Sequence, residues 1–282
     1  MDLRGKVSLV GAAESDLGKV ATNTSHLDLI GQATMRALDD AGLNLSDVDG
    51  VFAATSQSRM VGLGVCEYLG IKPVYIDSTQ IGGSSFMSHV SHAVAAIVTG
   101  KCEVALITYG STQRTMSRAA TSQREVAWYE DPYKPMMPPS AYAMAAARHM
   151  HEFGTTSEQL AWIKVAASTH AQYNEHAMLR DVVTVEDVVN SPMISDPLHR
   201  LDCCVISDGG GAIVMTTPEI AKSLGRPIVK YLGGGETIKH LDAGNVDLTY
   251  TGARHSGAAA FEESGVKHAD IKYASIYDGF TI

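Results

Sequence analysis

The residues with the clearest chemical meaning lie where a predicted strand runs directly into a long predicted helix. Gly82 and Gly83 form a tight turn there, and Ser84 or Ser85 can cap the helix that follows. The first amides of a helix lack partners within it and carry about half a positive charge. A cysteine at this point would be a strong nucleophile, but the sequence has glycine. The stretch predicts either an anion-attracting turn without a thiol or an ordinary tight turn.

Three other patterns carry less chemical meaning. His89 and His92 have the spacing of some metal ligands, but no third ligand is placed to join them, so no metal site is predicted. Gly62 and Gly64 lack the third glycine of a dinucleotide-binding fingerprint. Asp202 and Asp208 bracket a turn, where aspartates usually make local hydrogen bonds.

The four cysteines form no C-x-x-C pair, and no export signal is recognised, so they are expected to be reduced thiols in the cytoplasm. They are Cys66, Cys102, Cys203 and Cys204. The chain has 282 residues, 45% of them apolar and 19% charged, which excludes intrinsic disorder. A net charge of −9 without a basic cluster excludes a nucleic-acid binder. No apolar run approaches the roughly 18 residues that span a membrane.

The first third of the chain alternates between predicted strands and helices, which favours an α/β layered domain with a largely parallel sheet. The predicted strands are Val7–Val10, Val48–Ala54, Val74–Ile76 and Cys102–Tyr109. The predicted helices are His26–Ala41, a helix that closes with Cys66–Leu69, and Ser84–Thr99.

A proline-rich and helical stretch, residues 111–200, interrupts this alternation before the sheet resumes. Helices are predicted near Tyr142–Glu152 and Glu158–His176, followed by a glycine-rich turn, Ser207–Gly211, and a strand, Ala212–Met215. A second α/β unit then begins. Its predicted elements are a strand at Ile228–Leu232, a helix at Gly252–Ser264 and a strand at Ala274–Tyr277.

These features, in this order, resemble the thiolase superfamily, in the branch of lipid-transfer (sterol-carrier) thiolases and thiolase-like aldolases. The segments that carry the resemblance are the strand–turn–helix at 76–100, Gly100–Leu106, Leu201–Ala212 and Ile276–Phe280. The resemblance implies an α/β protein with a layered αβαβα fold, in which a helical loop domain is inserted into two related α/β units. Relatives continue beyond the Tyr277 segment, so the second unit is expected to be incomplete.

The resemblance also implies domain limits. The N-terminal thiolase-like α/β unit is expected at 1–120 plus 201–225, the helical loop domain at 121–200, and the partial C-terminal unit at 226–282.

The chain departs from the family at the positions that perform acyl transfer. In thiolases a cysteine begins the buried helix and takes up the acyl group, but that position is Gly83 here, or Gly82 in a register shifted by one. The family's Asn-Glu-Ala-Phe motif is matched by Tyr277–Phe280, so its polar position is a tyrosine. Retro-aldol cleavage needs no nucleophile; it needs a base for a β-hydroxyl proton and a hole for the developing thioester enolate.

The resemblance therefore implies roles for particular residues. Tyr277 is expected to transfer the proton, although it also fits an aromatic residue that ends a core strand. Asp278 is expected either to orient Tyr277 or to bind a nearby amide. The backbone amides of Gly82, Gly83 and Ser84 are expected to form the oxyanion hole. The family places Cys203 and Cys204 near the pantetheine arm of coenzyme A, but two small buried residues entering a strand fit this pair equally well.

We therefore expect an enzyme, a C–C lyase that cleaves a β-hydroxyacyl-CoA of the lipid or steroid side-chain type, with the coenzyme A thioester as substrate and no covalently bound cofactor. One alternative is a conventional thiolase acyltransferase whose nucleophile is Cys66 or Cys204. Another is a non-catalytic acyl-CoA or lipid-binding subunit. The expected partners are a second copy, bound mainly through the strand after Gly100, and a small OB-fold and zinc-ribbon subunit, with no nucleic acid or membrane.

Overall fold

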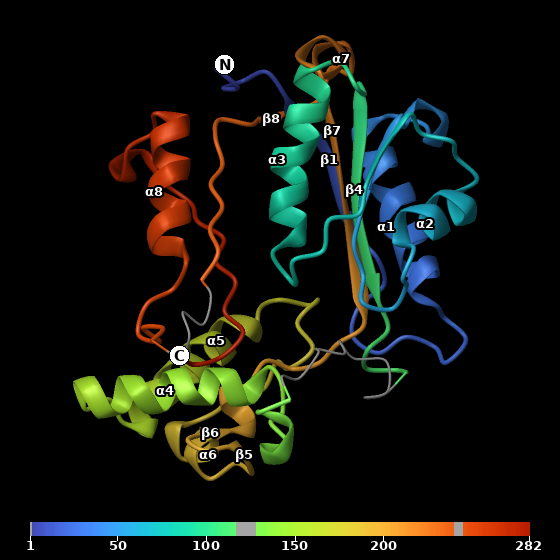
Figure 1. Ribbon diagram of the computed structural model, residues 1–282. Coiled ribbons are helices and arrows are strands. Elements are labelled where there is room, and N and C mark those ends of the chain that lie inside the picture. Colours follow the sequence, from blue (N-terminus) through green and yellow to red (C-terminus); the bar gives the residue numbers. More distant parts are fainter. Residues whose placement is uncertain (1, 117–127, 240–244) are drawn as a thin grey trace. The chain divides into compact units, whose positions relative to one another are not determined.

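The computed structural model describes residues 2–116, 128–239 and 245–282 (Figure 1). Contacts divide the chain into two compact units, which are described separately. The sheet unit comprises 1–122, 207–236 and 255–270, and the helical unit comprises 123–206, 237–254 and 271–282. The expected domain boundary at 120/121 lies outside the described residues, and the other expected limits stay a prediction.

The sheet unit contains most of the strands. Its strands are β1 (Ser8–Glu14), β2 (Gly50–Ala53), β3 (Tyr75–Asp77), β4 (Val104–Ser111), β7 (Gly209–Thr216) and β8 (Val229–Lys230). Its helices are α1 (His26–Ala41), α2 (Val61–Leu69), α3 (Ser85–Val98), α7 (Pro218–Ser223) and most of α8 (Ala253–Ser264).

The six strands form one mixed sheet in the order β3-β2-β4-β7-β1-β8. Strand β2 is parallel to β3 and β4, whereas β7 is antiparallel to β4 and β1, and β8 is antiparallel to β1. The expectation of a largely parallel sheet is therefore wrong. The helical crossovers through α2 and α3 impose parallel pairing on β2, β3 and β4, but β7 arrives from the helical unit and is under no such constraint.

This order also corrects the expected dimer contact. Strand β4, which follows Gly100, lies at the centre of the sheet and pairs with β2 on one side and β7 on the other. Its backbone groups are already used, so it cannot form a strand pair with a second copy. The two edges of the sheet are β3 and β8.

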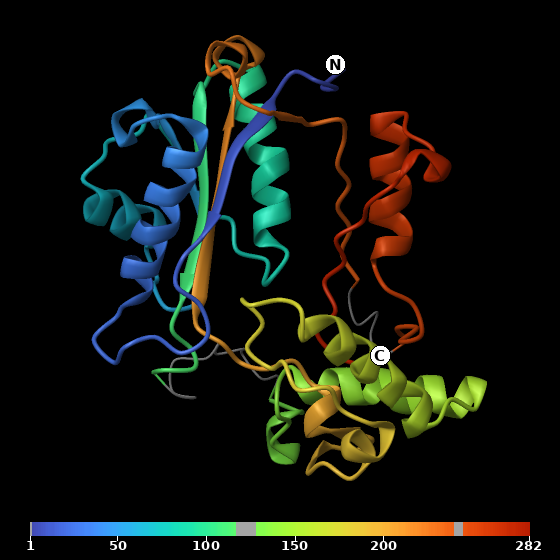
Figure 2. The ribbon, with the colours of Figure 1, turned by 180° about the vertical axis from the view of Figure 1, so that it is seen from behind.

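Helices cover both faces of the sheet, with α1 and α2 on one face and α3 on the other (Figures 1 and 2). Successive residues of a strand point to opposite faces. In β4, Val104 and Leu106 accordingly join the core under α1, while Ala105 and Ile107 join the core under α3. The unit is therefore a three-layer αβα sandwich with β4 buried on both sides.

Helix α1 begins and ends where the sequence predicts. The side chain of Ser25 accepts a hydrogen bond from the Asp28 amide, and the Asp28 carboxylate accepts one from the Ser25 amide. Gly42 ends the helix in the left-handed conformation. The helix also lies unusually close to the strands. A Cβ added to Gly11 would lie 2.2 Å from the Ala37 carbonyl oxygen, and one added to Gly110 would lie 2.4 Å from the His26 carbonyl oxygen.

The glycines predicted to form a turn before β7 are part of the strand itself. Gly209, Gly210 and Gly211 pair with Ser111, Gly110 and Tyr109 of β4. A Cβ on Gly210 would lie 2.3 Å from the Tyr109 carbonyl oxygen, so glycine is present here because the strands approach closely.

The helical unit contains the inserted helices and a short hairpin. Its elements are α4 (Pro139–Phe153), α5 (Ser157–Ala171), α6 (Val185–Val189), β5 (Met193–Ser195) and β6 (Leu198–His199). Helix α5 ends five residues before the predicted His176. Its small core consists of Ala143, Ala146, Leu160, Leu198 and Phe280.

The strand predicted at Ala274–Tyr277 is absent. These residues are exposed, and within the described part of the chain no strand pairs with them. Only the following Phe280 makes a bridge, with Cys203. The segment has the apolar and aromatic composition of a strand, but it does not form one because no described strand pairs with it. Among the described helices, none has the length and apolar character needed to cross a membrane.

Candidate functional site

The turn before α3 is closed by Ser85, the first residue of the helix. Its hydroxyl accepts a hydrogen bond from the Ile81 amide at 2.9 Å and donates one to the Gly82 carbonyl oxygen at 2.6 Å. The Ser85 amide donates to the same carbonyl at 3.1 Å. Gly82 has a φ of +89°, in the left-handed region, which explains the choice of glycine at that position.

This closure leaves three amides available at the start of α3. Gly82, Gly83 and Ser84 are exposed in the sheet unit. Their backbone N–H groups donate no hydrogen bond to any other described residue. The 14-residue helix α3 adds its dipole at this end. The turn therefore presents three exposed amide donors at the positive end of the α3 dipole.

Two histidines of α3 hold the segment that leads into this turn. His89 is fully buried, and its Nε2 donates to the Thr79 carbonyl oxygen at 2.9 Å. His92 Nδ1 lies 2.6 Å from Asp77 Oδ2, while Asp77 Oδ1 accepts hydrogen bonds from the Thr79 amide and hydroxyl. Burial lowers the pKa of His89, so its ring is neutral and Nδ1 carries a lone pair. These contacts were not predicted from the sequence, although the His89/His92 spacing and the Asp77-x-Thr79 pattern are both present in it.

A second group of predicted site residues gathers in the helical unit. Cys203, Cys204 and Asp278 line one pocket of about 100 Å³, together with Lys164 of α5. Tyr277 is not among the residues that line this pocket, and its side chain is 89% exposed. The structure therefore brings three of the predicted residues together, with Tyr277 next to them in the chain. Gly82, Gly83 and Ser84 belong to the other unit.

The environments of the cysteines decide which thiol is reactive. Cys66 and Cys102 are buried. Burial raises the pKa of the Cys66 thiol, and burial together with the charge of Asp49 raises the pKa of Cys102 to about 12. Burial, with Asp202 and Cys204 nearby, raises the pKa of Cys203 to about 11. Because the thiolate is the nucleophile, Cys204 is the accessible candidate.

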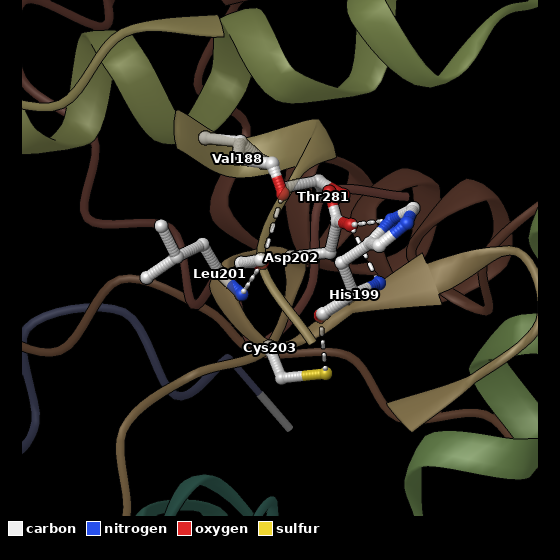
Figure 3. A network of polar contacts seen from close by, with 7 residues as sticks. Val188, His199, Leu201, Asp202, Cys203 and Thr281 are labelled. Atoms are coloured by element: carbon white, nitrogen blue, oxygen red, sulfur yellow. Dashed lines mark hydrogen bonds and ion pairs between the residues drawn. The ribbon is translucent and has the colours of Figure 1, made fainter. Parts of the chain in front are cut away.

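A buried carboxylate, Asp202, lies directly before this pair of cysteines (Figure 3). Its hydrogen-bond partners include Thr281, 79 residues further along the chain. The predicted local hydrogen bond is present, from the His199 amide, but the C-terminal segment also folds back onto this turn and adds the distant contact. Sequence proximity could not reveal such a partner.

Comparison with solved structures defines the fold. The chain is similar to a structure described as "Ltp2-ChsH2(DUF35) aldolase", with a TM-score of 0.78 and 29% identity over 99% of this chain and 75% of that chain. It also matches a monomeric SCP2-thiolase-like protein from Mycobacterium smegmatis, with a TM-score of 0.78 and 20% identity over 99% of this chain and 61% of that one. The fold is that of the thiolases, as predicted from the sequence.

Sequence relatives define the family. A model described as "Thiolase C-terminal domain-like" matches residues 235–282. A steroid side-chain-cleaving aldolase of Thermomonospora curvata is 32% identical over 99% of this chain and 75% of its own length. A 17-hydroxy-3-oxo-4-pregnene-20-carboxyl-CoA lyase of Mycobacterium tuberculosis is 30% identical over 99% and 76%. An acetyl-CoA acetyltransferase of Methanothermobacter thermautotrophicus is 26% identical over 98% and 74%.

This chain belongs to the thiolase superfamily, in the branch of lipid-transfer thiolases and thiolase-like aldolases. Its named relatives are lyases and acyltransferases, so the predicted family and the predicted enzyme class are both confirmed.

Proposed function

We propose that this enzyme cleaves a β-hydroxyacyl-CoA by a retro-aldol reaction without a covalent acyl intermediate. The observation that carries the proposal is the turn before α3, which keeps three available amides but has glycine in place of a thiol. Tyr277 accepts the proton of the β-hydroxyl group, and the Cα–Cβ bond breaks as a carbonyl forms at Cβ. The electron pair moves into the thioester enolate, whose oxygen the amides of Gly82, Gly83 and Ser84 stabilise. Return of the proton to Cα releases the shortened acyl-CoA.

The proposed substrate class is supported by two relatives whose names describe C–C bond cleavage. One is a steroid side-chain-cleaving aldolase and another acts as a lyase on a steroid carboxyl-CoA. The proposed substrate is therefore a coenzyme A thioester with a bulky lipid or steroid group, and no covalently bound cofactor takes part. Cys203 and Cys204 would approach the pantetheine arm, and Asp278 would orient Tyr277. Lys164 adds a positive charge to the same pocket.

Acyl transfer is the second candidate, and the acetyl-CoA acetyltransferase relative favours it. That reaction requires a thiolate to carry the acyl group. Cys204 is the exposed cysteine, so acyl transfer predicts a covalent adduct on Cys204. A non-catalytic acyl-CoA-binding subunit would form neither adduct nor cleavage product.

The decisive experiment compares Tyr277→Phe with the unmodified chain in an assay of β-hydroxyacyl-CoA cleavage. Removing the phenolic hydroxyl should lower kcat by about 10²- to 10⁴-fold, the usual contribution of a proton-transfer group. Tyr273→Phe is the matched control, because Tyr273 lies in the same exposed segment and is 88% exposed. Full activity of Tyr277→Phe, or an acetyl adduct on Cys204 after incubation with acetyl-CoA, would contradict the proposal.

The proposed assembly includes a second copy and a smaller subunit. Because β4 is central, a homodimer must use another surface. Strand β3 pairs only with β2 among the described residues and so offers a strand edge. Apolar side chains are exposed along and near this edge, including Val74, Ile76 and Ile81. The similar aldolase structure is described with two components, Ltp2 and ChsH2, which supports a small partner subunit. Light scattering of the purified chain, with and without a candidate subunit, tests both contacts.

A further inference from the structure

The carboxylate of Asp202 is almost completely enclosed, with 4% of its side chain exposed, yet both of its oxygens have donors (Figure 3). Oδ1 accepts a hydrogen bond from the Thr281 hydroxyl at 2.8 Å, and Oδ2 accepts one from the His199 amide at 2.7 Å. His199 Nδ1 lies 3.4 Å from the same Oδ2. A buried carboxylate is retained only where such donors replace water.

Backbone hydrogen bonds reinforce this side-chain contact. The Thr281 amide donates to the Asp202 carbonyl oxygen at 3.0 Å, and the Cys204 amide donates to the Gly279 carbonyl oxygen at 2.9 Å. Between them, Cys203 and Phe280 form an antiparallel bridge. Residues 202–204 and 279–281, with the Asp202 carboxylate and the Thr281 hydroxyl, are called the clamp below.

The turn that contributes residues 202–204 to the clamp is itself held in place by hydrogen bonds. The hydroxyl of Ser191 donates to the Val188 carbonyl oxygen at 2.8 Å and accepts a hydrogen bond from the Leu201 amide at 3.2 Å. The turn that carries Asp202 is thereby tied to α6. On the other side, Phe280 stacks on Tyr142 of α4, with ring centroids 4.1 Å apart. The clamp therefore joins the C-terminal segment to an anchored part of the helical unit.

The chain changes abruptly from exposed to buried where the clamp begins. Tyr277 is 89% exposed, whereas Phe280 and Thr281 are 7% and 4% exposed. All residues from 271 to 278 are exposed, so packing does little to hold them. The contacts that start at Gly279 are therefore the nearest buried anchor for Tyr277 and Asp278.

We propose that Asp202 is a positioning residue, whose clamp on Thr281 sets the place of Tyr277 and Asp278 beside the pocket lined by Cys203 and Cys204. This inference rests on the proposed function, since it assigns Tyr277 to proton transfer. Proton transfer requires accurate placement of the transferring group. Asp202 acts through its hydrogen bond with the Thr281 hydroxyl and through the backbone of residues 279–281.

The test removes the Thr281 hydroxyl without changing its shape. Thr281→Val should lower kcat by about 10- to 100-fold, with KM kept within about twofold, because a displaced catalytic group impairs the chemical step more than binding. Thr281→Ser keeps the hydroxyl and should restore kcat. Asp202→Asn should give an intermediate loss, because one oxygen can still accept from Thr281 while the new amide nitrogen faces the His199 N–H. Thr216→Val is the matched control, because Thr216 is fully buried and its hydroxyl donates to Glu103 in the sheet unit.

Hydrogen exchange of the peptide covering 277–282 gives a readout that does not depend on activity. In Thr281→Val its amides should exchange about tenfold faster, and in Thr281→Ser and Thr216→Val they should exchange as in the unmodified chain. Unchanged exchange in Thr281→Val would overturn the clamp. Faster exchange with unchanged kcat would overturn its positioning role while the proposed function stands. Absence of cleavage by the unmodified chain would overturn the proposed function, and with it the positioning role. Hydrogen exchange of the 277–282 peptide would still test whether the clamp exists.

Discussion

Replacing Gly83 by cysteine tests whether the turn before α3 still provides the environment of a nucleophile. No atom outside the adjoining residues lies within 4 Å of a Cβ built at Gly83, and its backbone is not left-handed, so Gly83→Cys should fold without strain. Gly82, one residue earlier, has a φ of +89°. The same substitution at Gly82 should therefore lower the free energy of unfolding by about 1–2 kcal/mol.

The expected reactivity follows from the helix dipole. A helix N-terminus stabilises a negative charge by about 0.3–1 kcal/mol, which lowers a thiol pKa by about 0.2–0.7 at about 1.36 kcal/mol for each pKa unit. From an ordinary pKa of about 8.5, the thiolate fraction at pH 7 rises from about 3% to about 5–14%. Alkylation should accelerate by about 1.5- to 5-fold in proportion.

The assay measures the rate of iodoacetamide addition at residue 83 by peptide mass spectrometry. Met144→Cys is the reference, because Met144 is 65% exposed and lies in the interior of α4, away from a helix end. Incubation with acetyl-CoA should then acetylate Gly83→Cys but leave the unmodified chain unacetylated. A thiol at residue 83 that reacts no faster than the Met144→Cys thiol would refute the reasoning about this turn.

Three further predictions concern the fold and its titrating groups. Gly110→Ala should lower the free energy of unfolding by at least about 1–3 kcal/mol, because its Cβ would lie 2.4 Å from a carbonyl oxygen of α1. Gly211→Ala, whose nearest contact is 3.7 Å, should change it by less than about 0.5 kcal/mol; urea denaturation compares the two. The lowered pKa of buried His89 means that the unfolded chain binds more protons at low pH, so stability should fall as pH drops below about 6.5. His89→Gln should flatten this dependence, and an unaltered slope of melting temperature against pH would count against it. Iodoacetamide should modify Cys204 alone in the native chain, because the other thiols are buried or have a raised pKa; rapid modification of a second cysteine would contradict this.

Local sequence patterns were sufficient to predict the elements that depend only on residues close together in the chain. Helix α1 has an apolar period, a capping Ser25 and a terminating Gly42, and it forms over the predicted range. The turn at Gly82 and Gly83 and the helix after it were also predicted, because strand, glycines and helix follow one another directly. The family was recognised because several such segments occur in the right order.

The failures involve partners far along the chain. Ala274–Tyr277 has the composition of a strand but no strand to pair with among the described residues. Gly209–Gly211 has the composition of a turn but pairs with the end of β4. Asp202 and Thr281 lie 79 residues apart, so their contact leaves no local signal. The prediction of a largely parallel sheet was wrong for the same reason, because the direction in which two strands pair depends on the path of the whole chain.

The contact between α1 and the sheet has a mechanical consequence. At Gly11 and Gly110 the helix backbone rests directly on strand backbone, with no side chain between them to change rotamer. Sliding or rolling of the helix would drive carbonyl oxygens into the strands, so α1 and the strands beneath it must move as one rigid body. Adjustment of the sheet unit to a bulky ligand is therefore not expected to come from α1.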